Sequence, residues 1–165
     1  MPKDIPKLDR INLSILETLQ LEARISNQDL AERVGLSPSA CLARVRLLES
    51  AGYIRRYIAD MDVNSFSSTL SAFVEITLES HFPKDFEDFD AAIAALPEVV
   101  ASYKVSGRFD YLLLIICSDM QQLRELSDKM LEAGIGIAKF TTVPIIEQPK
   151  KFSGYPIRTL AHQAH

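Results

Sequence analysis

The sequence has few cysteines and no long apolar run, and each shortage excludes a class of protein. Its two cysteines, Cys41 and Cys117, are too few and too isolated for a disulfide framework or a zinc site. The longest apolar stretch, Tyr111 to Cys117, is far shorter than the roughly 20 residues of a transmembrane helix. The N-terminal residues lack the apolar core of a signal peptide. We therefore expect buried, reduced thiols in a cytoplasmic protein with no membrane partner.

The charge is unevenly distributed along the 165 residues, which suffice for one domain or two small ones. The net charge of −4, taken over the whole chain, disfavours binding to nucleic acid. However, residues 1–60 carry nine Lys or Arg against eight Asp or Glu (+1), and residues 61–165 carry nine against fourteen (−5). Within residues 37–58, four arginines face Glu49 alone, a net +3. Attraction to phosphate is expected there.

The N-terminal residues predict three helices with a tight turn between the second and the third. Apolar residues at helical spacing predict the first helix over about 8 to 21. Ser26 can cap a second helix that ends at Gly35, and Ser37 can cap a third that ends at Gly52. Two short helices joined by a turn containing glycine are typical of a helix-turn-helix.

The predicted third helix has one face that suits the DNA major groove. A helical wheel groups Cys41, Val45 and Leu48 toward the core. The opposite face combines small residues with one long cation: Ser39, Ala43, Arg46 and Ser50. Such a face can bring an arginine to a guanine edge, and Arg44 on its flank suits phosphate or a neighbouring base. The alternative is a solvated face with two ordinary arginines.

After Gly52, residues 53–58 alternate in a short β pattern, which predicts a strand acting as a wing. Arg55 and Arg56 could follow the phosphate backbone or form the polar side of an exposed strand, and the pattern does not separate these alternatives. The candidate DNA contacts are Ser37, Ser39, Ala43, Arg44, Arg46, Arg55 and Arg56. A DNA-binding domain is therefore predicted at residues 1–59.

Residues 60–69 are polar and serine-rich, which predicts a connector to a second domain at 70–150. The pattern there is β-α-β-β-α-β. Strands are expected at 70–78, 99–105, 111–117 and 137–147, and helices at 86–96 and 120–133. Pro144 interrupts the last strand and suggests an edge or a bulge. The sequence thus predicts an α+β protein, a winged helix-turn-helix joined to a ferredoxin-like domain.

The strand predicted at Tyr111 to Cys117 is apolar on both of its faces. The helices of a ferredoxin-like domain cover only one face of the sheet, so a monomer would expose the other. A second copy packed sheet against sheet would cover it, and it would supply two recognition helices for a two-fold operator. Residues 151–165 form a tail with no assigned role, in which disorder is expected rather than a metal site at His162 and His165.

Two pairs of segments carry a resemblance to a known family. The first pair resembles the helix-turn-helix of the leucine-responsive/asparagine regulator (Lrp/AsnC) family and comprises Ile25–Arg46 and Leu48–Ile54. The second pair resembles the C-terminal domain of that family and comprises Phe73–Leu78 and Val105–Leu113. The likeness covers residues 8 to about 150. It implies binding to double-stranded DNA, dimers that commonly assemble into octamers, and an amino acid bound at contacts between dimers, with no further cofactor.

The resemblance also implies that Gly107 and Asp110 belong to the hairpin beside the bound amino acid, and that Met120, Thr141, Thr142 and Val143 line its pocket. Val105 and Arg108 are added to the candidate effector site as their neighbours in the hairpin. Gly107 would let hairpin amides approach a carboxylate, and Asp110 can take an α-ammonium or order the loop. Arg108 departs from the family pattern and could recruit a carboxylate or pair with a neighbouring acid. The apolar neighbours favour a small or aliphatic amino acid.

Two other functions use the same fold. Sirohaem decarboxylases resemble this family, but the three histidines here (His81, His162 and His165) fall outside the pocket stretches, and the sequence has no nucleophile–base pair, metal cluster or phosphate loop. An amino-acid-binding module without DNA binding would usually lack the first sixty residues. We therefore expect a sequence-specific transcription regulator, not an enzyme, whose assembly or DNA affinity responds to a small amino acid.

Overall fold

The computed structural model describes residues 6–162 and divides the chain into two compact units. One unit contains Met1–Asp60 together with Lys150–His165, and the other contains Met61–Pro149. The boundary near residue 60 falls at the start of the predicted connector. The chain therefore passes between the units twice, because its C-terminal residues return to the first one. Among residues 6–162, no helix is both long and apolar enough to cross a membrane.

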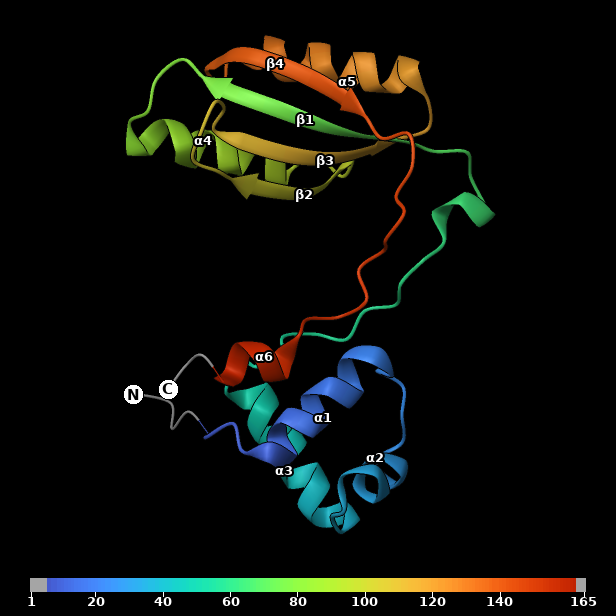
Figure 1. The fold of residues 1–165 in the computed structure, drawn as a ribbon. Coiled ribbons are helices and arrows are strands. Elements are labelled where there is room, and N and C mark those ends of the chain that lie inside the picture. Colours follow the sequence, from blue (N-terminus) through green and yellow to red (C-terminus); the bar gives the residue numbers. More distant parts are fainter. Residues whose placement is uncertain (1–5, 163–165) are drawn as a thin grey trace. The chain divides into compact units, whose positions relative to one another are not determined.

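The first unit contains the three predicted helices, α1 (Arg10–Leu21), α2 (Asn27–Val34) and α3 (Pro38–Ser50) (Figure 1). The side chains of Ser26 and Ser37 accept backbone N–H bonds at the starts of α2 and α3, as predicted. Gly35 ends α2 in the left-handed conformation. The core of this unit consists of buried side chains from all three helices: Ile15, Leu19, Leu30, Ala31, Cys41 and Leu48.

The predicted wing strand does not form. Residues 53–58 follow α3 as an irregular segment, and none of them belongs to a strand. The amides of Tyr53 and Ile54 both donate to the carbonyl oxygen of Leu48, which completes the end of α3. A strand needs a neighbour that accepts its ladder hydrogen bonds, and the unit provides none within its described residues. The alternation of polar and apolar residues at 53–58 is therefore not sufficient to form a strand.

The expectation of a disordered tail is wrong for the described part of the tail. Ile157–His162 form a short helix, α6, that belongs to the first unit and contacts α1. Arg158 Nε donates to both carboxylate oxygens of Glu17 at 2.8 and 2.9 Å. The amide of Tyr155 donates to Gln20 Oε1 at 2.8 Å, and Gln20 Nε2 donates back to the Tyr155 carbonyl at 3.1 Å. The side chains of His162 and His165 lie outside the described residues.

The second unit has the predicted ferredoxin-like order. Its elements are β1 (Leu70–Leu78), α4 (Pro83–Ala94), β2 (Val99–Lys104), β3 (Tyr111–Cys117), α5 (Met120–Glu132) and β4 (Ile137–Pro144), preceded by a short 3₁₀ turn, η1 (Val63–Ser65). All strand pairs are antiparallel, in the order β2-β3-β1-β4. As Pro144 suggested, β4 is an edge strand. The helix α4 begins three residues earlier than predicted, at Pro83, because Asp85 caps it through the amide of Phe82.

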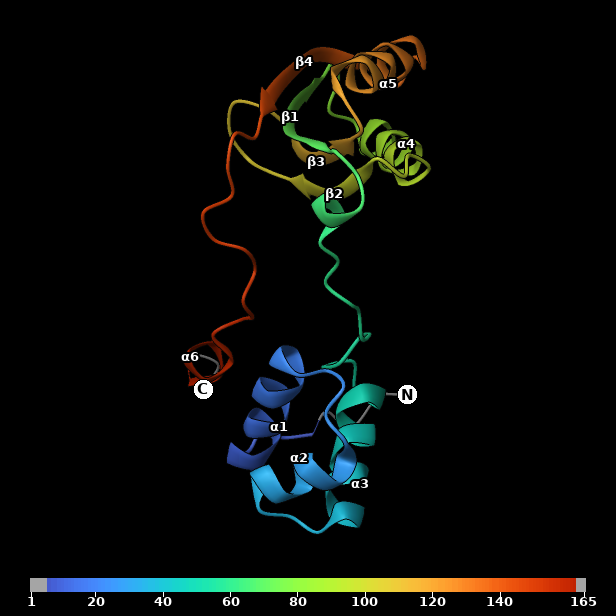
Figure 2. The same ribbon diagram turned by 90° about the vertical axis from the view of Figure 1, so that its right-hand side faces the viewer.

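Both helices, α4 and α5, cover the same face of the sheet (Figure 2). On that face, alternate residues of β1 and β3, such as Val74 and Leu113, are completely buried. The opposite face carries Phe73, Leu112 and Leu114, which are only partly buried in the single chain. Cys41 and Cys117 are both buried free thiols, as predicted, and burial raises the pKa of each.

Candidate DNA-contact face and effector site

The two faces of α3 separate as the sequence predicts. Cys41 and Leu48 are fully buried. The small residues and the cation of the predicted contact face are exposed: Ser39, Ala43, Arg46 and Ser50. Asn27 Nδ2 donates to the carbonyl of Pro38 at 2.8 Å and thereby joins the start of α2 to the start of α3. The helix-turn-helix therefore presents an outward face with one long cation among small side chains, as major-groove contact requires.

Ser37 acts as a cap in the free protein. The amide of Ala40 donates to Ser37 Oγ at 3.3 Å, and this oxygen lies 3.3 Å from Ser39 Oγ. Because the cap satisfies an amide that would otherwise have no helical partner, Ser37 is needed to start α3. Its place among the DNA contacts remains a prediction, as does that of Ser39.

Arg44 holds the N-terminus of α1. Its Nη1 donates to Asp9 Oδ2 at 2.7 Å and to Asn12 Oδ1 at 2.9 Å. Asp9 is also the N-cap of α1, and the Asn12 amide lowers the pKa of its carboxyl group, with Arg44 adding to the effect. This contact within the fold is neither the DNA contact predicted for Arg44 nor the solvated position of the alternative. Among residues 6–162, by contrast, no ion pair involves Arg46, Arg55 or Arg56.

The hairpin between β2 and β3 forms the first part of the candidate effector site. The amide of Val105 donates to the Asp110 carbonyl at 2.9 Å, and the amide of Asp110 donates to the Ile76 carbonyl at 2.8 Å. Between them, Gly107 is exposed and has φ +151°, a conformation that L side chains rarely adopt. The hairpin is therefore fixed at its base and carries glycine near its tip.

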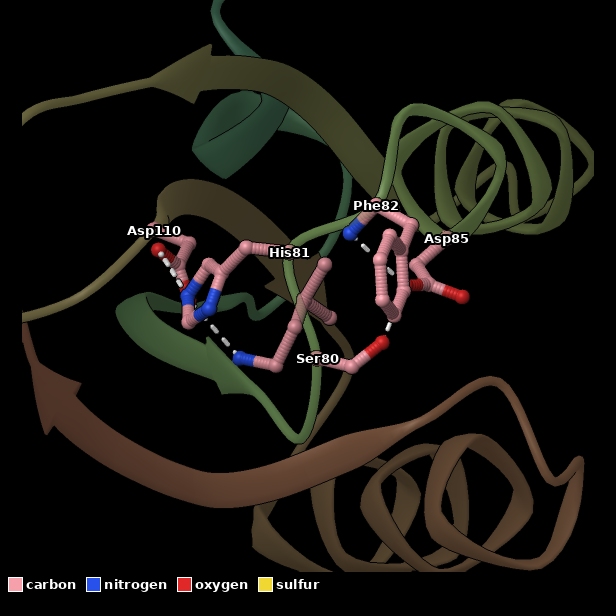
Figure 3. Close-up of polar contacts among 6 residues, drawn as sticks. Ser80, His81, Phe82, Asp85 and Asp110 are labelled. Atoms are coloured by element: carbon pink, nitrogen blue, oxygen red, sulfur yellow. Dashed lines mark hydrogen bonds and ion pairs between the residues drawn. The ribbon is translucent and has the colours of Figure 1, made fainter.

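The carboxylate of Asp110 joins the hairpin to the end of β1 (Figure 3). Oδ2 accepts the Leu78 amide at 2.8 Å, and Oδ1 lies 3.0 Å from His81 Nε2. Only 19% of the Asp110 side chain is exposed. The predicted loop-ordering role of this residue is therefore present in the structure. His81, which was expected outside the pocket stretches, lies beside it. No local pattern could show this, since the two residues are 29 positions apart.

Arg108 pairs with a neighbouring acid, one of its two predicted roles. Its Nη2 lies 2.5 Å from Glu75 Oε1, and the Glu75 side chain is only 18% exposed. Glu75 in turn is the register partner of Thr141 on β4. Glu75 therefore connects the hairpin to the first residue of the predicted Thr141–Val143 stretch.

Of the remaining candidate effector residues, Met120 lies at the other end of the sheet, and Thr142 and Val143 lie near its middle. Met120 begins α5, just beyond the end of β3 that is remote from the hairpin, and 52% of its side chain is exposed. Val143 pairs with Phe73, which itself pairs with Leu114 in the middle of β3. The seven residues of β3 span about 24 Å at roughly 3.4 Å per residue. One chain therefore does not bring Met120 to Gly107 and Asp110, whereas a pocket shared between subunits could use both ends. Thr142 pairs with Val74, so it lies on the face of the sheet that α4 and α5 cover.

The comparisons with known proteins match both units. Residues 8–55 match a winged helix-turn-helix DNA-binding model, and residues 71–155 match the Lrp/AsnC ligand binding domain. The leucine-responsive regulatory protein of Salmonella typhimurium is 42% identical over 152 residues, which cover 92% of this chain and 93% of the relative. Its counterpart from Escherichia coli K12 is 41% identical over the same shares.

Two solved structures with bound ligand are similar over nearly the whole chain. A transcriptional regulator from Neisseria meningitidis in complex with L-methionine has a TM-score of 0.86 and 32% identity, covering 93% of this chain and 99% of that one. A feast or famine regulatory protein from Mycobacterium tuberculosis complexed with L-methionine has a TM-score of 0.82 and 29% identity, covering 90% and 98%. These relatives are named as regulators, which favours regulation over the sirohaem-decarboxylase alternative. The chain belongs to the Lrp/AsnC family of transcription regulators.

Proposed function

We propose that this protein regulates transcription by binding double-stranded DNA through α3, and that a small amino acid changes its assembly or its DNA affinity. The observation that carries the DNA part is the outward face of α3, where Arg46 stands among Ser39, Ala43 and Ser50. Arg46 reads a base edge in the major groove, and Arg55 and Arg56 contact phosphate. The protein acts in the cytoplasm, where a bacterial chromosome lies.

The effector site combines the hairpin of one subunit with the Thr141–Val143 stretch of another. Amides near Gly107 receive the carboxylate of the amino acid, and Asp110 Oδ1 receives its ammonium. Support comes from relatives that are named leucine-responsive or were solved with L-methionine. Because Glu75 neutralises Arg108, a methionine-like or leucine-like side chain fits better than an acidic one.

Assembly follows from the open face of the sheet. Phe73, Leu112 and Leu114 are partly exposed in one chain, and a second copy packed on this face would bury them. The resulting homodimer presents two copies of α3, as a two-fold operator requires. Dimers associate further, up to the octamer that the family resemblance implies, and the effector site lies at the contacts between them.

Calorimetry with each of the twenty amino acids, on the parent protein and on Asp110→Ala, tests the effector site. We expect methionine or leucine to bind the parent, and we expect the variant to lose at least tenfold in affinity, since about 1.4 kcal/mol corresponds to a factor of ten. Asp128→Ala, the same change at an exposed position of α5, is the control and should bind like the parent. Binding that is unaffected by the loss of Asp110 would contradict the site, and no binding by the parent would contradict the effector class.

A further inference from the structure

One carboxylate oxygen of Asp110 accepts a backbone hydrogen bond within the fold, and the other faces His81. Oδ2 accepts the Leu78 amide at 2.8 Å, a bond that ties the hairpin to β1. Oδ1 lies 3.0 Å from His81 Nε2, which also lies 3.2 Å from Oδ2. The imidazole is 59% exposed and the carboxylate 19% exposed. His81 therefore reaches Asp110 from the solvent side and occupies the more available of its two oxygens (Figure 3).

The turn that carries His81 is anchored on both sides, so the imidazole is held toward Asp110. Immediately before His81, the hydroxyl of Ser80 donates to Asp85 Oδ2, and immediately after it, the amide of Phe82 donates to the same oxygen at 3.0 Å. The ring of His81 also lies 6.0 Å from that of Phe86, centroid to centroid, at 47°. These contacts come from the first turn of α4, which thereby positions a residue of the candidate effector site.

An ammonium that binds Asp110 needs the oxygen that His81 occupies. We propose that His81 competes with the α-ammonium of the effector for Asp110 Oδ1 and makes effector affinity depend on pH. This inference rests on the proposed function of Asp110 as the ammonium acceptor. A neutral imidazole can turn aside or share the carboxylate at little electrostatic cost. A protonated imidazole pairs with Asp110 and repels a second cation within a few ångströms.

The sign of the effect follows from this competition. Effector binding prefers neutral His81, so binding releases a proton and affinity rises with pH until the imidazole is neutral. Affinity falls as pH drops through the range, about 5 to 8, in which histidines titrate. If the charged form excludes the ligand, affinity drops about tenfold by one pH unit below the midpoint of the histidine titration.

Other charged groups near His81 must be set against this effect. From α4, Asp85 contacts the turn, and Asp90 lies 3.9 Å from Lys104 of β2. Lys104 Nζ also lies 3.9 Å from the centre of the Phe86 ring, against which His81 packs. Burial raises the pKa of Tyr111, the next residue after Asp110. Between about pH 5.5 and 8.5, carboxylates and lysines ordinarily keep their charge. A slope in that interval that disappears when His81 is replaced therefore reports its imidazole.

The test is calorimetry of L-methionine and L-leucine binding to the full chain from pH 5.5 to 8.5. We expect the parent to lose about tenfold in affinity between the two ends. His81→Gln keeps a polar side chain that cannot titrate, so it should bind at pH 8.5 and show a flat profile. Lys104→Gln, the control, removes a nearby charge but keeps the imidazole, so it should keep the slope of the parent. A slope that persists in His81→Gln overturns the inference.

A second measurement uses the parent protein alone and does not depend on how the variants fold. The ring of His81 can be titrated by nuclear magnetic resonance with and without saturating L-methionine. By linkage, the ligand should move the midpoint of that titration to lower pH, and an unmoved midpoint overturns the inference. If neither amino acid binds the parent at any pH, the proposed effector function fails and this inference fails with it. If binding occurs without the slope, only the competition fails.

Discussion

Arg44 on α3 and Asp9 at the start of α1 form an ion pair, with 2.7 Å between Nη1 and Oδ2. The same nitrogen donates to Asn12 Oδ1 at 2.9 Å, and only 4% of the surface of Asn12 is exposed. Arg44→Ala would leave this buried oxygen without a donor. We expect the free energy of unfolding to fall by about 1–3 kcal/mol, which denaturant titration would measure.

Arg46→Ala is the matched control for that prediction, since it removes the same side chain two residues along the same helix. Arg46 is exposed, and its loss should change the free energy of unfolding by less than about 0.5 kcal/mol. Equal stability losses in the two variants would show that the contacts of Arg44 with Asp9 and Asn12 do not stabilise the first unit.

The lowered pKa of Asp9 predicts a pH-dependent contribution to stability. The Asn12 amide, and then Arg44, favour the charged carboxylate in the folded state. This contribution is fully present above the unfolded pKa, about 3.9, and is lost as pH falls through the lower folded value. Asp9→Asn keeps a capping oxygen and removes the charge. The difference in unfolding free energy between parent and variant should be constant above about pH 5 and shrink in acid. A difference that does not change with pH would contradict this role.

The features predicted correctly from the sequence depend on neighbouring residues. Ser26 and Ser37 cap the helices that follow them because a cap acts within three residues, and the two faces of α3 follow from helical spacing. The limits of β1 and β3 agree with the predicted ones because polar residues flank both largely apolar stretches.

The features missed from the sequence depend on residues far apart in the chain. Local alternation predicted a strand at 53–58, but the described residues of its unit include no partner strand. The contact of His81 with Asp110 spans 29 residues, and that of Arg158 with Glu17 spans 141. Nothing in the local pattern around either residue encodes its partner. Chain topology alone brings them together.

Arg46→Ala should weaken binding to a specific operator by about 1–3 kcal/mol and relax the preference at one base position, because a bidentate contact to guanine is lost. Fluorescence anisotropy on a set of singly substituted operators would measure both effects. Arg124→Ala, the same change on α5 of the other unit, is the control and should bind normally. Unchanged base preference in Arg46→Ala would remove this side chain from the groove.

Arg55→Ala should act differently, because a phosphate contact carries no sequence information. We expect affinity to fall for all DNA sequences alike, and the slope of log affinity against log salt concentration to decrease in magnitude by about one. Titrations at four salt concentrations would give the slope. A variant that loses affinity for one operator only would mean that Arg55 reads a base.

Gly154 should be needed for the C-terminal segment to dock on α1. Its φ is +96°, and a Cβ atom there would lie 2.8 Å from Gln20 Cδ. The side chain of Gln20 could move, but the backbone conformation would still be strained, by about 1–3 kcal/mol. Gly154→Val should therefore release α6 and speed hydrogen exchange of its amides. Ser153→Val, at the exposed neighbouring position, is the control. Unchanged exchange in Gly154→Val would show that docking tolerates a side chain there.

The last prediction concerns assembly through the open face of the sheet. Leu114 pairs with Phe73 across β1 and β3, and both side chains remain partly exposed on the face that α4 and α5 do not cover. A charge introduced there costs little in a monomer, where water can reach it, but would be buried without a partner between two packed sheets. Leu114→Lys should therefore dissociate the dimer at micromolar concentration while the second unit stays folded. Lys129→Glu, on exposed α5, should leave assembly unchanged. Sedimentation of both variants, and of residues 65–149 alone, would decide the matter: a parent fragment that is a folded monomer would show that this face is not the interface.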